Sequence, residues 1–367
     1  MINLHEINKN EHLPQITPEE ISDEKVIEEI WQLKEELKDQ VLILGHHYQQ
    51  DEVIQFTDFT GDSLALAKKA KTSDIPYVIF CGVHFMAETA DMLTKKKQKI
   101  ILPDLMAGCS MADMATGDEI EQCWETLKQH TEEKIIPITY INCTAELKAF
   151  VGKNDGSICT SSNARKIIEW GLERGEKLLF FPDQHLGRNT CFDLGISLDE
   201  MVVYNPHLVN GGLTPEQIKK AKIILWHGFC SVHQGFNASQ IKNIKASSPE
   251  TIVIVHPECN FETVQAADLN GSTSYIIDTI EKAPAGSRFA VGTEINLVNR
   301  LAAKYTDKKI ISLAPYQCLC TTMYRIRPRW LLNSFRGIKS NRPINVIEVD
   351  QDTTKYAMKA LNNMLEI

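Results

Sequence analysis

Several features that identify other classes of protein are missing from this 367-residue sequence. Its first residues lack a basic stretch followed by an apolar core, so no signal peptide is predicted. No apolar run approaches the roughly 18 residues that a membrane-spanning helix needs. The formal net charge of −9 argues against a broad nucleic-acid-binding surface. We therefore expect a soluble, cytoplasmic protein with neither a nucleic-acid nor a membrane partner.

The ten cysteines show neither of two common patterns. A disulfide framework is not expected in a chain without a secretory signal. No CxxC pair occurs, which disfavours a zinc ribbon. Cys318 and Cys320 form the tightest pair, and that spacing alone identifies no known site. We expect a few cysteines to be ligands or catalytic groups and the others to be small buried hydrophobic residues.

Short apolar runs recur along the chain and predict buried strands. They lie near residues 41–48, 77–82, 100–103, 135–142, 178–183, 222–226, 251–258, 289–294 and 309–312. Continuous apolar runs of this kind are typical of parallel strands that helices cover on both faces. The predicted fold class is therefore α/β with parallel sheets.

The same order of landmarks occurs three times. In each copy a strand ends in polar residues, a Ser or Thr opens a helix, and a later strand leads to a cysteine. The hydroxyl and thiol pairs are Ser63 and Cys109, Ser161 and Cys230, and Thr273 and Cys320. They are separated by 46, 69 and 47 residues, which predicts a threefold repeat with about 22 extra residues in the middle copy. Three coincidentally similar α/β segments are the alternative, which the agreement of three landmarks in each copy disfavours.

The repeat predicts the domain organisation. Three αβα domains are expected at residues 36–118, 119–240 and 241–325, with the insertion of the second at about 184–215. Residues 1–35 are predicted to form an N-terminal helical extension, with Thr17 as N-cap and Pro18 at the first helical position. Residues 326–367 are predicted to form a C-terminal segment that packs on the core.

Polar residues follow the first strand of each copy. Ligands of open parallel sheets bind beyond the carboxyl ends of the strands, so these residues are candidates for a site. They are His46 and Tyr48, Tyr140 and Asn142, and His256 and Glu258. In an extended segment two positions that are two apart face the same way, so His256 and Glu258 are an acid–base candidate pair. A lone histidine there would more often be a hydrogen-bonded structural residue; His233 is a further candidate, and His47 and His227 are weaker ones.

The three helix-opening hydroxyls, Ser63, Ser161 and Thr273, favour an anionic ligand. A helix N-terminus has free N–H groups that bind anions. Each hydroxyl taken singly is more typical of an N-cap. Three of them around one centre indicate a small molecule with several carboxylates or a phosphate.

Three cysteines that follow three equivalent strands could hold a metal in more than one way. Structural zinc with three thiolates recruits a fourth protein ligand, and catalytic zinc more often uses His or carboxylate. A [4Fe–4S] cluster on three cysteines leaves one iron open as a Lewis acid, which promotes dehydration. Each cysteine by itself could equally be a buried inert thiol.

Motifs spread over residues 40 to 325 closely resemble the quinolinate synthase family. They are Gly45-His46-His47-Tyr48-Gln49, Gly61-Asp62-Ser63-Leu64, Gly82-Val83-His84-Phe85-Met86-Ala87-Glu88-Thr89-Ala90, Gly108-Cys109-Ser110-Met111-Ala112, Tyr140-Ile141-Asn142, Thr160-Ser161-Ser162-Asn163-Ala164, Trp226-His227-Gly228-Phe229-Cys230-Ser231-Val232-His233, His256-Pro257-Glu258-Cys259 and Gly292-Thr293-Glu294. The resemblance implies three αβα domains around a pseudo-threefold axis, with the active site at the centre. It also implies condensation of iminosuccinate with dihydroxyacetone phosphate to quinolinate, with release of phosphate and water, in NAD biosynthesis. Functional coupling to L-aspartate oxidase is a further implication.

The resemblance also assigns roles to residues of this sequence. The [4Fe–4S] ligands are expected to be Cys109, Cys230 and Cys320. Cys318 competes with Cys320, which is preferred because the last cysteine of the family is followed three residues on by Met, as Cys320 is by Met323. The expected substrate contacts are His46, Ser63, Tyr140, Asn142, Ser161, His256, Glu258 and Thr273. Acid–base catalysis is expected from Glu258, Tyr48 and His256.

Two other functions are compatible with the residues themselves. One is a different dehydratase with an open-iron cluster that acts on a hydroxy acid. The other is an iron–sulfur redox sensor that binds a partner. The three anion-suited helix starts would be unnecessary in a sensor.

Overall fold

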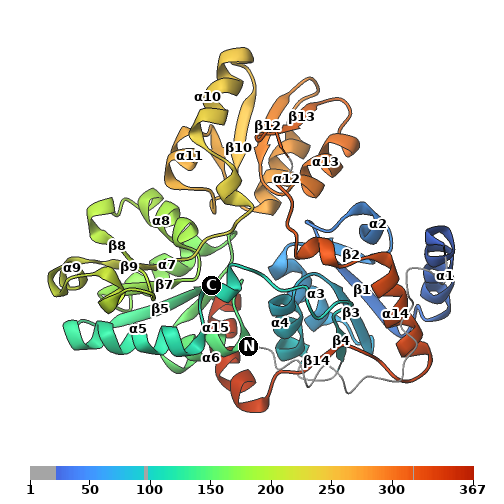
Figure 1. Ribbon diagram of the computed structural model, residues 1–367, viewed down its shortest axis with the longest axis horizontal. Helices are drawn as coiled ribbons and strands as arrows, with labels where there is room; N and C mark the ends of the chain where they lie inside the picture. The colour runs from blue at the N-terminus through green and yellow to red at the C-terminus, as the bar shows by residue number, and fades with distance from the viewer. Residues whose placement is uncertain (1–21, 95–97, 317) are drawn as a thin grey trace.

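The computed structural model describes residues 22–94, 98–316 and 318–367. The strands described form three separate sheets, which Figure 1 shows as three lobes around a common centre. We call them the first, second and third units, in the order of their sheets along the chain. The predicted α/β class with three similar parallel-sheet parts is confirmed.

The first unit has a five-stranded sheet in the order β14-β4-β3-β1-β2. Its strands are β1 (Val41–His46), β2 (Phe59–Gly61), β3 (Tyr77–Cys81), β4 (Lys99–Ile101) and β14 (Val346–Ile347). Its helices are α1 (Asp23–Glu36), α2 (Asp51–Ile54), α3 (Ser63–Thr72), α4 (His84–Thr94) and the 3₁₀ turn η2 (Ala112–Met114). All pairings are parallel except that of β14 with β4.

The second unit has a parallel sheet in the order β6-β5-β7-β9-β8. Its strands are β5 (Ile135–Tyr140), β6 (Ser157–Cys159), β7 (Lys177–Phe181), β8 (Met201–Tyr204) and β9 (Ile223–Trp226). Its helices are α5 (Gly117–His130), α6 (Ala145–Lys153), α7 (Ala164–Leu172), α8 (Gln184–Asp193) and α9 (Pro215–Lys220), with the turns η3 (Leu198–Glu200), η4 (Val209–Gly212) and η5 (His233–Gly235).

The third unit has a four-stranded parallel sheet in the order β11-β10-β12-β13. Its strands are β10 (Ile252–Val255), β11 (Leu269–Asn270), β12 (Arg288–Gly292) and β13 (Lys309–Ser312). Its helices are α10 (Ala238–Ser247), α11 (Phe261–Ala266), α12 (Thr273–Lys282), α13 (Ile295–Lys304) and the turn η6 (Met323–Arg325).

The strand order is the same in the three units once β8 and β14 are set aside. The first strand of each unit, β1, β5 or β10, lies between the second and third. These strands are buried along most of their length because they consist mainly of Val, Ile and Leu between layers of helices. Parallel strands all end at one edge of a sheet, so each unit presents its strand ends, with their polar residues, at one edge.

The second unit has extra elements between α8 and its last strand in the chain, β9. A short connection joins α4 to β4 and α13 to β13, whereas η3, β8, η4 and α9 separate α8 from β9. The range expected from the sequence, 184–215, begins with α8, which has counterparts in the other units. The additional elements lie at 198–220.

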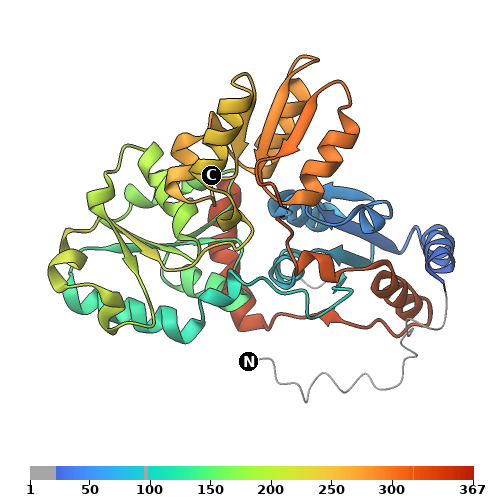
Figure 2. The same cartoon turned by 45° about the horizontal axis from the view of Figure 1, so that its top comes forward.

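The C-terminal residues add to two units. Helix α14 (Pro328–Lys339) packs against α1 and β3, and β14 extends the first sheet. Helix α15 (Gln351–Glu366) packs against α6, β6 and α4, between the second and first units (Figure 2). It approaches α6 so closely at Gly152 that a Cβ there would lie 1.9 Å from the carbonyl oxygen of Tyr356. Glycine is therefore required for this contact.

The described part of the N-terminal extension contains helix α1. Its described N-cap is Ser22 and its first residue is Asp23, while the expected cap Thr17 lies outside the described residues. Among the helices described, none combines the length and the apolar character that crossing a membrane requires.

Candidate active site

A cavity of about 70 Å³ lies where the three units meet. Every residue expected to bind substrate, catalyse or hold metal contributes to its lining. These residues are His46, Tyr48, Ser63, Cys109, Tyr140, Asn142, Ser161, Cys230, His256, Glu258, Thr273 and Cys320. The structure thus brings together residues that are up to 274 positions apart in the sequence. Their individual roles remain predictions.

The three cysteines that line the cavity lie on loops of the same construction. Each precedes a 3₁₀ turn by three residues, and the first backbone N–H of that turn donates to the cysteine sulfur. The sulfur and donor pairs are Cys109 and Ala112, Cys230 and His233, and Cys320 and Met323. The cysteine carbonyls accept from Asp113, Gln234 and Tyr324, each four residues on, at 3.0, 3.1 and 3.0 Å. One local loop is therefore built three times.

Cys318 occupies a different environment. It is 6% exposed and packs in the hydrophobic cluster of the third unit, and it is not among the residues that line the cavity. Its sulfur lies over Gly235, where an added Cβ would be only 2.8 Å away. Of the two candidates, Cys320 is therefore the one that lies with Cys109 and Cys230.

The three cavity thiols suit a positively charged ligand. Burial raises the pKa of each, that of Cys109 to about 12, and the neighbouring thiols add to the effect at Cys109 and Cys230. Thiolates that repel one another in a buried site need a cation to compensate them. Backbone N–H groups that point at sulfur are suited to iron–sulfur ligation. The thiols therefore fit a [4Fe–4S] cluster. A second group of possible metal ligands consists of Cys230, His233 and Glu258, whose ligand atoms all lie within 4.8 Å of one another.

The helix-opening hydroxyls are not N-caps. The caps of α3 and α12 are the preceding residues, Asp62 and Ser272, which accept from backbone N–H groups at 2.9 and 3.3 Å. The N-cap of α7 is Asn163, two residues after Ser161. The Asn163 side chain makes no capping hydrogen bond, whereas those of Asp62 and Ser272 do. None of the hydroxyls of Ser63, Ser161 and Thr273 is therefore the N-cap group, and these residues line the cavity near the helix starts.

The turn after β10 holds a buried carboxylate between two imidazoles. Glu258 Oε2 lies 2.9 Å from Nδ1 of His233, and the ring of His233 stacks on that of His256 at a centroid distance of 4.5 Å. The backbone N–H of Glu258 donates to Nδ1 of His256 at 3.4 Å, and burial lowers the pKa of His256 to about 3. Burial opposes ionisation of Glu258, but His233 and His256 hold its pKa below its usual value. Glu258 is therefore a carboxylate at neutral pH.

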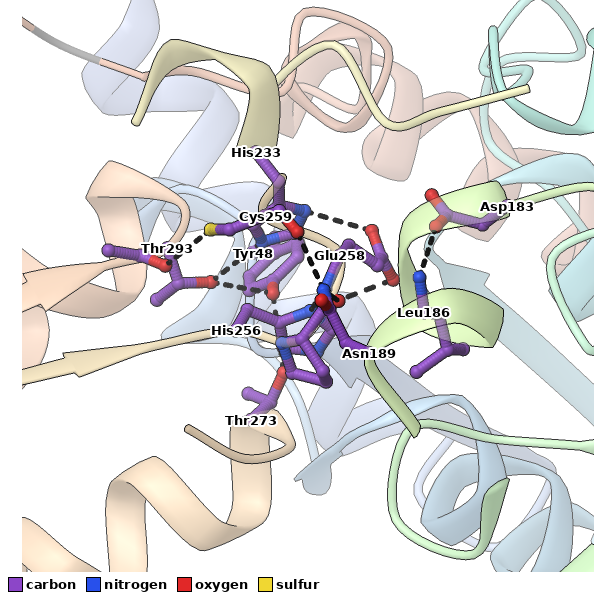
Figure 3. A network of polar contacts seen from close by, with 12 residues as sticks. Tyr48, Asp183, Leu186, Asn189, His233, His256, Glu258, Cys259, Thr273 and Thr293 are labelled. Carbon is purple, nitrogen blue, oxygen red and sulfur yellow. Dashed lines mark hydrogen bonds and ion pairs between the residues drawn. The ribbon is translucent and has the colours of Figure 1, made fainter. Parts of the chain in front are cut away.

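The turn after β1 holds a partly buried phenol. The hydroxyl of Tyr48 contacts the hydroxyls of Thr293 and Thr273 (Figure 3). The oxygen–oxygen distances are 2.8 and 3.3 Å. The backbone N–H of Tyr48 donates to Nδ1 of His46 at 3.1 Å. Burial, and then the charge of Glu258, raise the pKa of Tyr48 well above its usual value. Tyr48 therefore retains its proton at neutral pH.

The second unit contributes a tyrosine and an amide. Tyr140 is buried and donates a hydrogen bond to Glu258, which helps to keep the pKa of that carboxyl low. Burial, and then the charge of Glu258, raise the pKa of Tyr140. The side-chain oxygen of Asn142 is buried and has no hydrogen-bond partner among the described residues. It is an acceptor available to a ligand.

Two residues matter more in the structure than the sequence indicated. Thr293 was noticed only within a motif, yet its hydroxyl contacts both the Tyr48 hydroxyl and Nε2 of His233, the latter at 3.3 Å. The strand-end rule would have found it, because it directly follows β12. His233 lines the cavity, whereas His227 is exposed and neither His227 nor His47 is among its lining residues.

Comparison with known proteins supports one family. The family model described as "Quinolinate synthetase A protein" matches residues 28–366. A quinolinate synthase of Corynebacterium glutamicum is 50% identical over 97% of this chain and 92% of its own length. Those of Streptomyces coelicolor and Bacillus anthracis are 52% and 50% identical, over 91% and 94% of this chain and 86% and 94% of their own lengths.

Proposed function

The chain belongs to the quinolinate synthase family of NAD biosynthesis, and on that premise we propose that the central cavity is its active site. There iminosuccinate condenses with dihydroxyacetone phosphate to quinolinate, with release of phosphate and water. The observation that supports this most is the convergence of three thiols, three helix starts and an acid–base set from three units in one cavity.

Substrate binding is assigned to the helix starts and the polar strand ends. The free N–H groups at the starts of α3, α7 and α12 suit carboxylate and phosphate oxygens. The hydroxyls of Ser63, Ser161 and Thr273 add donors at the same places. His46, Tyr140 and Asn142 line the remaining wall and orient the ligand between them.

Proton transfer is assigned to three residues with contrasting environments. Environments that push pKa values apart distinguish the acid from the base. Glu258, ionised beside His233, accepts protons at its carboxylate oxygens as the enamine carbon of iminosuccinate attacks the triose and during the later isomerisation. Tyr48, which keeps its proton, donates at its hydroxyl to departing oxygen. His256, neutral and stacked on His233, presents Nε2 because Nδ1 already accepts the backbone N–H of Glu258.

We assign the cluster to Cys109, Cys230 and Cys320. These three thiols would hold a [4Fe–4S] cluster whose fourth iron has no protein ligand, and that iron would supply Lewis-acid chemistry toward carboxylate and hydroxyl groups. The side chains already named bind the substrate, orient it and transfer its protons. As in the expectation from the sequence, functional coupling to L-aspartate oxidase, which would supply iminosuccinate, belongs to this proposal.

Replacing cysteines one at a time tests the proposal. After anaerobic purification, Cys230→Ala should lose the iron–sulfur absorbance, the iron and sulfide content and quinolinate formation together. Cys318→Ala is the matched control, since Cys318 is a buried thiol two residues from Cys320 that does not line the cavity. It should keep the cluster and the rate. Full activity of Cys230→Ala, or cluster loss in Cys318→Ala with retention in Cys320→Ala, would refute the assignment.

A further inference from the structure

The turn that presents Tyr48 is held from another unit. Residues 46–49 form a turn closed by the bond from the Gln49 N–H to the His46 carbonyl at 2.9 Å. Its outward carbonyls all meet helix α13 of the third unit. Arg300 donates to the carbonyls of His47 and Gln49 at 2.9 and 2.5 Å, and Asn296 donates to that of Tyr48 at 3.2 Å.

A turn of the third unit is held in the same way by a helix of the second unit. There the turn at 256–259 is closed by the bond from the Cys259 N–H to the His256 carbonyl at 3.0 Å. Its carbonyls at Pro257 and Cys259 accept from Asn189 of helix α8, in the second unit, at 2.8 and 2.9 Å. Figure 3 shows Asn189 reaching this turn from beneath Glu258. Asn189 and Arg300 each lie five residues after the first residue of their helix.

The first unit completes the cycle in a reduced form. Its helix α4 provides Glu88, whose carboxylate accepts the N–H of Ala145, just after the second unit's turn, at 3.0 Å. In every unit, therefore, the helix that follows β3, β7 or β12 contacts the backbone at the first-strand turn of a neighbouring unit or, in the case of α4, just after that turn. Because the neighbouring unit contacts backbone atoms, it can fix the position of the turn whatever side chains the turn carries.

From these contacts we propose that Arg300 and Asn296 are positioning residues for Tyr48. The proposal rests on the catalytic role given to Tyr48 under the proposed function. The Tyr48 hydroxyl reaches Thr293 and Thr273, which belong to the third unit, only if the turn of the first unit is held against that unit. The planar guanidinium of Arg300 has donors enough to hold two carbonyls and the Asp51 carboxylate, which it contacts at 2.7 Å. A displacement of about 1 Å at a catalytic group can reduce a rate about 100-fold.

Arg300→Gln should lower kcat about tenfold or more, since its shorter side chain loses both carbonyl contacts. Arg300→Lys, with one nitrogen in place of the fork, should fall between this variant and the wild type. Arg288→Gln is the matched control, because Arg288 forms an exposed ion pair with Glu250 in the same unit, and should leave kcat unchanged. Iron and sulfide content and melting temperature should show that each variant is folded and loaded.

A double-mutant cycle separates positioning from general damage, because residues that act through one another are not additive. Tyr48→Phe alone should lower kcat about 100-fold, within the range of lost acid–base catalysis. When Arg300→Gln is added to Tyr48→Phe, kcat should fall by a further factor of about two at most. When Asn189→Ser is added to Tyr48→Phe instead, the fall in kcat should be the product of the falls in the two single variants. The reason is that Asn189 contacts the turn at 256–259 and not the Tyr48 turn.

The outcomes distinguish the two proposals. A wild-type rate for Tyr48→Phe would refute the role of Tyr48 in the proposed function. A slow Tyr48→Phe together with a wild-type rate for Arg300→Gln would refute the positioning role alone. So would fully multiplicative effects of Arg300→Gln and Tyr48→Phe, or a loss of iron confined to Arg300→Gln.

Discussion

The turns after β1 and β10 share a backbone design and differ in chemistry. Each begins with a buried histidine whose Nδ1 accepts the N–H of the residue two positions on, at 3.1 Å from Tyr48 and 3.4 Å from Glu258. Burial lowers the pKa of both histidines, His46 and His256, to about 3. A neighbouring unit holds the carbonyls of both turns. What differs is the side chain at the third position, an ionised carboxylate in one turn and a protonated phenol in the other.

The difference shows how a repeated fold produces an asymmetric site. The shared hydrogen bonds place the third residue of each turn at the cavity, whatever that residue is. Its surroundings then support its charge state: His233 stabilises the anion of Glu258, whereas the hydroxyls of Thr273 and Thr293 are the hydrogen-bond partners of the Tyr48 oxygen among the described residues. Thr293 joins the two groups, because its hydroxyl contacts both the Tyr48 hydroxyl and His233.

The largest expected effect comes from removing the charge that distinguishes the two turns. Glu258→Gln keeps the shape of the side chain but leaves no base, so kcat should fall about 1,000-fold. Iron and sulfide content should not change, since Glu258 is not a proposed cluster ligand. Glu262→Gln, on the exposed side of α11, is the control and should be active. An unchanged rate in Glu258→Gln would remove it from the proton path.

A smaller effect is expected from removing the hydroxyl group that links the two turns. Thr293→Val removes the hydroxyl that contacts both Tyr48 and His233, and we expect kcat to fall about tenfold. The buried imidazole would also lose a hydrogen-bond partner, so the free energy of unfolding should drop by about 1–3 kcal/mol. Thr293→Ser restores the hydroxyl and should recover most of both quantities, measured by steady-state kinetics and urea unfolding. A wild-type rate and stability for Thr293→Val would show that the hydroxyl does not matter.

The smallest effect tests what the two turns have in common. A histidine with a folded pKa of about 3 and an unfolded pKa of 6.5 leaves the unfolded chain binding more protons below pH 6.5. Stability is then fully present above pH 6.5 and falls as the pH decreases toward 3. Between pH 6.5 and 5.5 each histidine should contribute a loss of about 1 kcal/mol.

Urea unfolding at these two pH values checks this expectation. In His46→Gln the loss of unfolding free energy between these pH values should be smaller than in the wild type by the contribution of one histidine. The same is expected of His256→Gln. The exposed His227 provides the control, since His227→Gln should leave the pH dependence unchanged. A pH dependence that is identical in His46→Gln and the wild type would contradict the burial of a neutral imidazole at that position.

Much of the fold could be predicted because strand patterns are local. Runs such as Ile135–Ile138 identify a buried strand from neighbouring residues alone, and three such series in the same order predicted three similar sheets. The helix caps could not be predicted as well. Asp62 and Ser63 are adjacent and both are good cap residues, and only the backbone conformation at Asp62 determines that it is the cap.

Those cavity residues that follow a predicted strand in each repeat could be predicted from the sequence. Polar residues at the ends of first strands, and cysteines after the last, can be recognised in each repeat without knowledge of the other repeats. Thr293, Asn189 and Arg300 could not be assigned in this way, because what matters about them is contact with a different unit. No pattern within one unit states which neighbour its helix will meet.

The sequence by itself determined the three strand series, the three loops that end in cysteine and the chemical character of the strand ends. It did so because hydrophobic period, loop length and side-chain type are properties of short segments. Only the tertiary structure decided that Cys320 and not Cys318 lines the cavity, that the pKa of Tyr48 is raised while that of Glu258 is lowered, and that α13 holds the Tyr48 turn. Burial, charge and backbone position at the centre depend on three units at once, and those contacts exist only after the chain has folded.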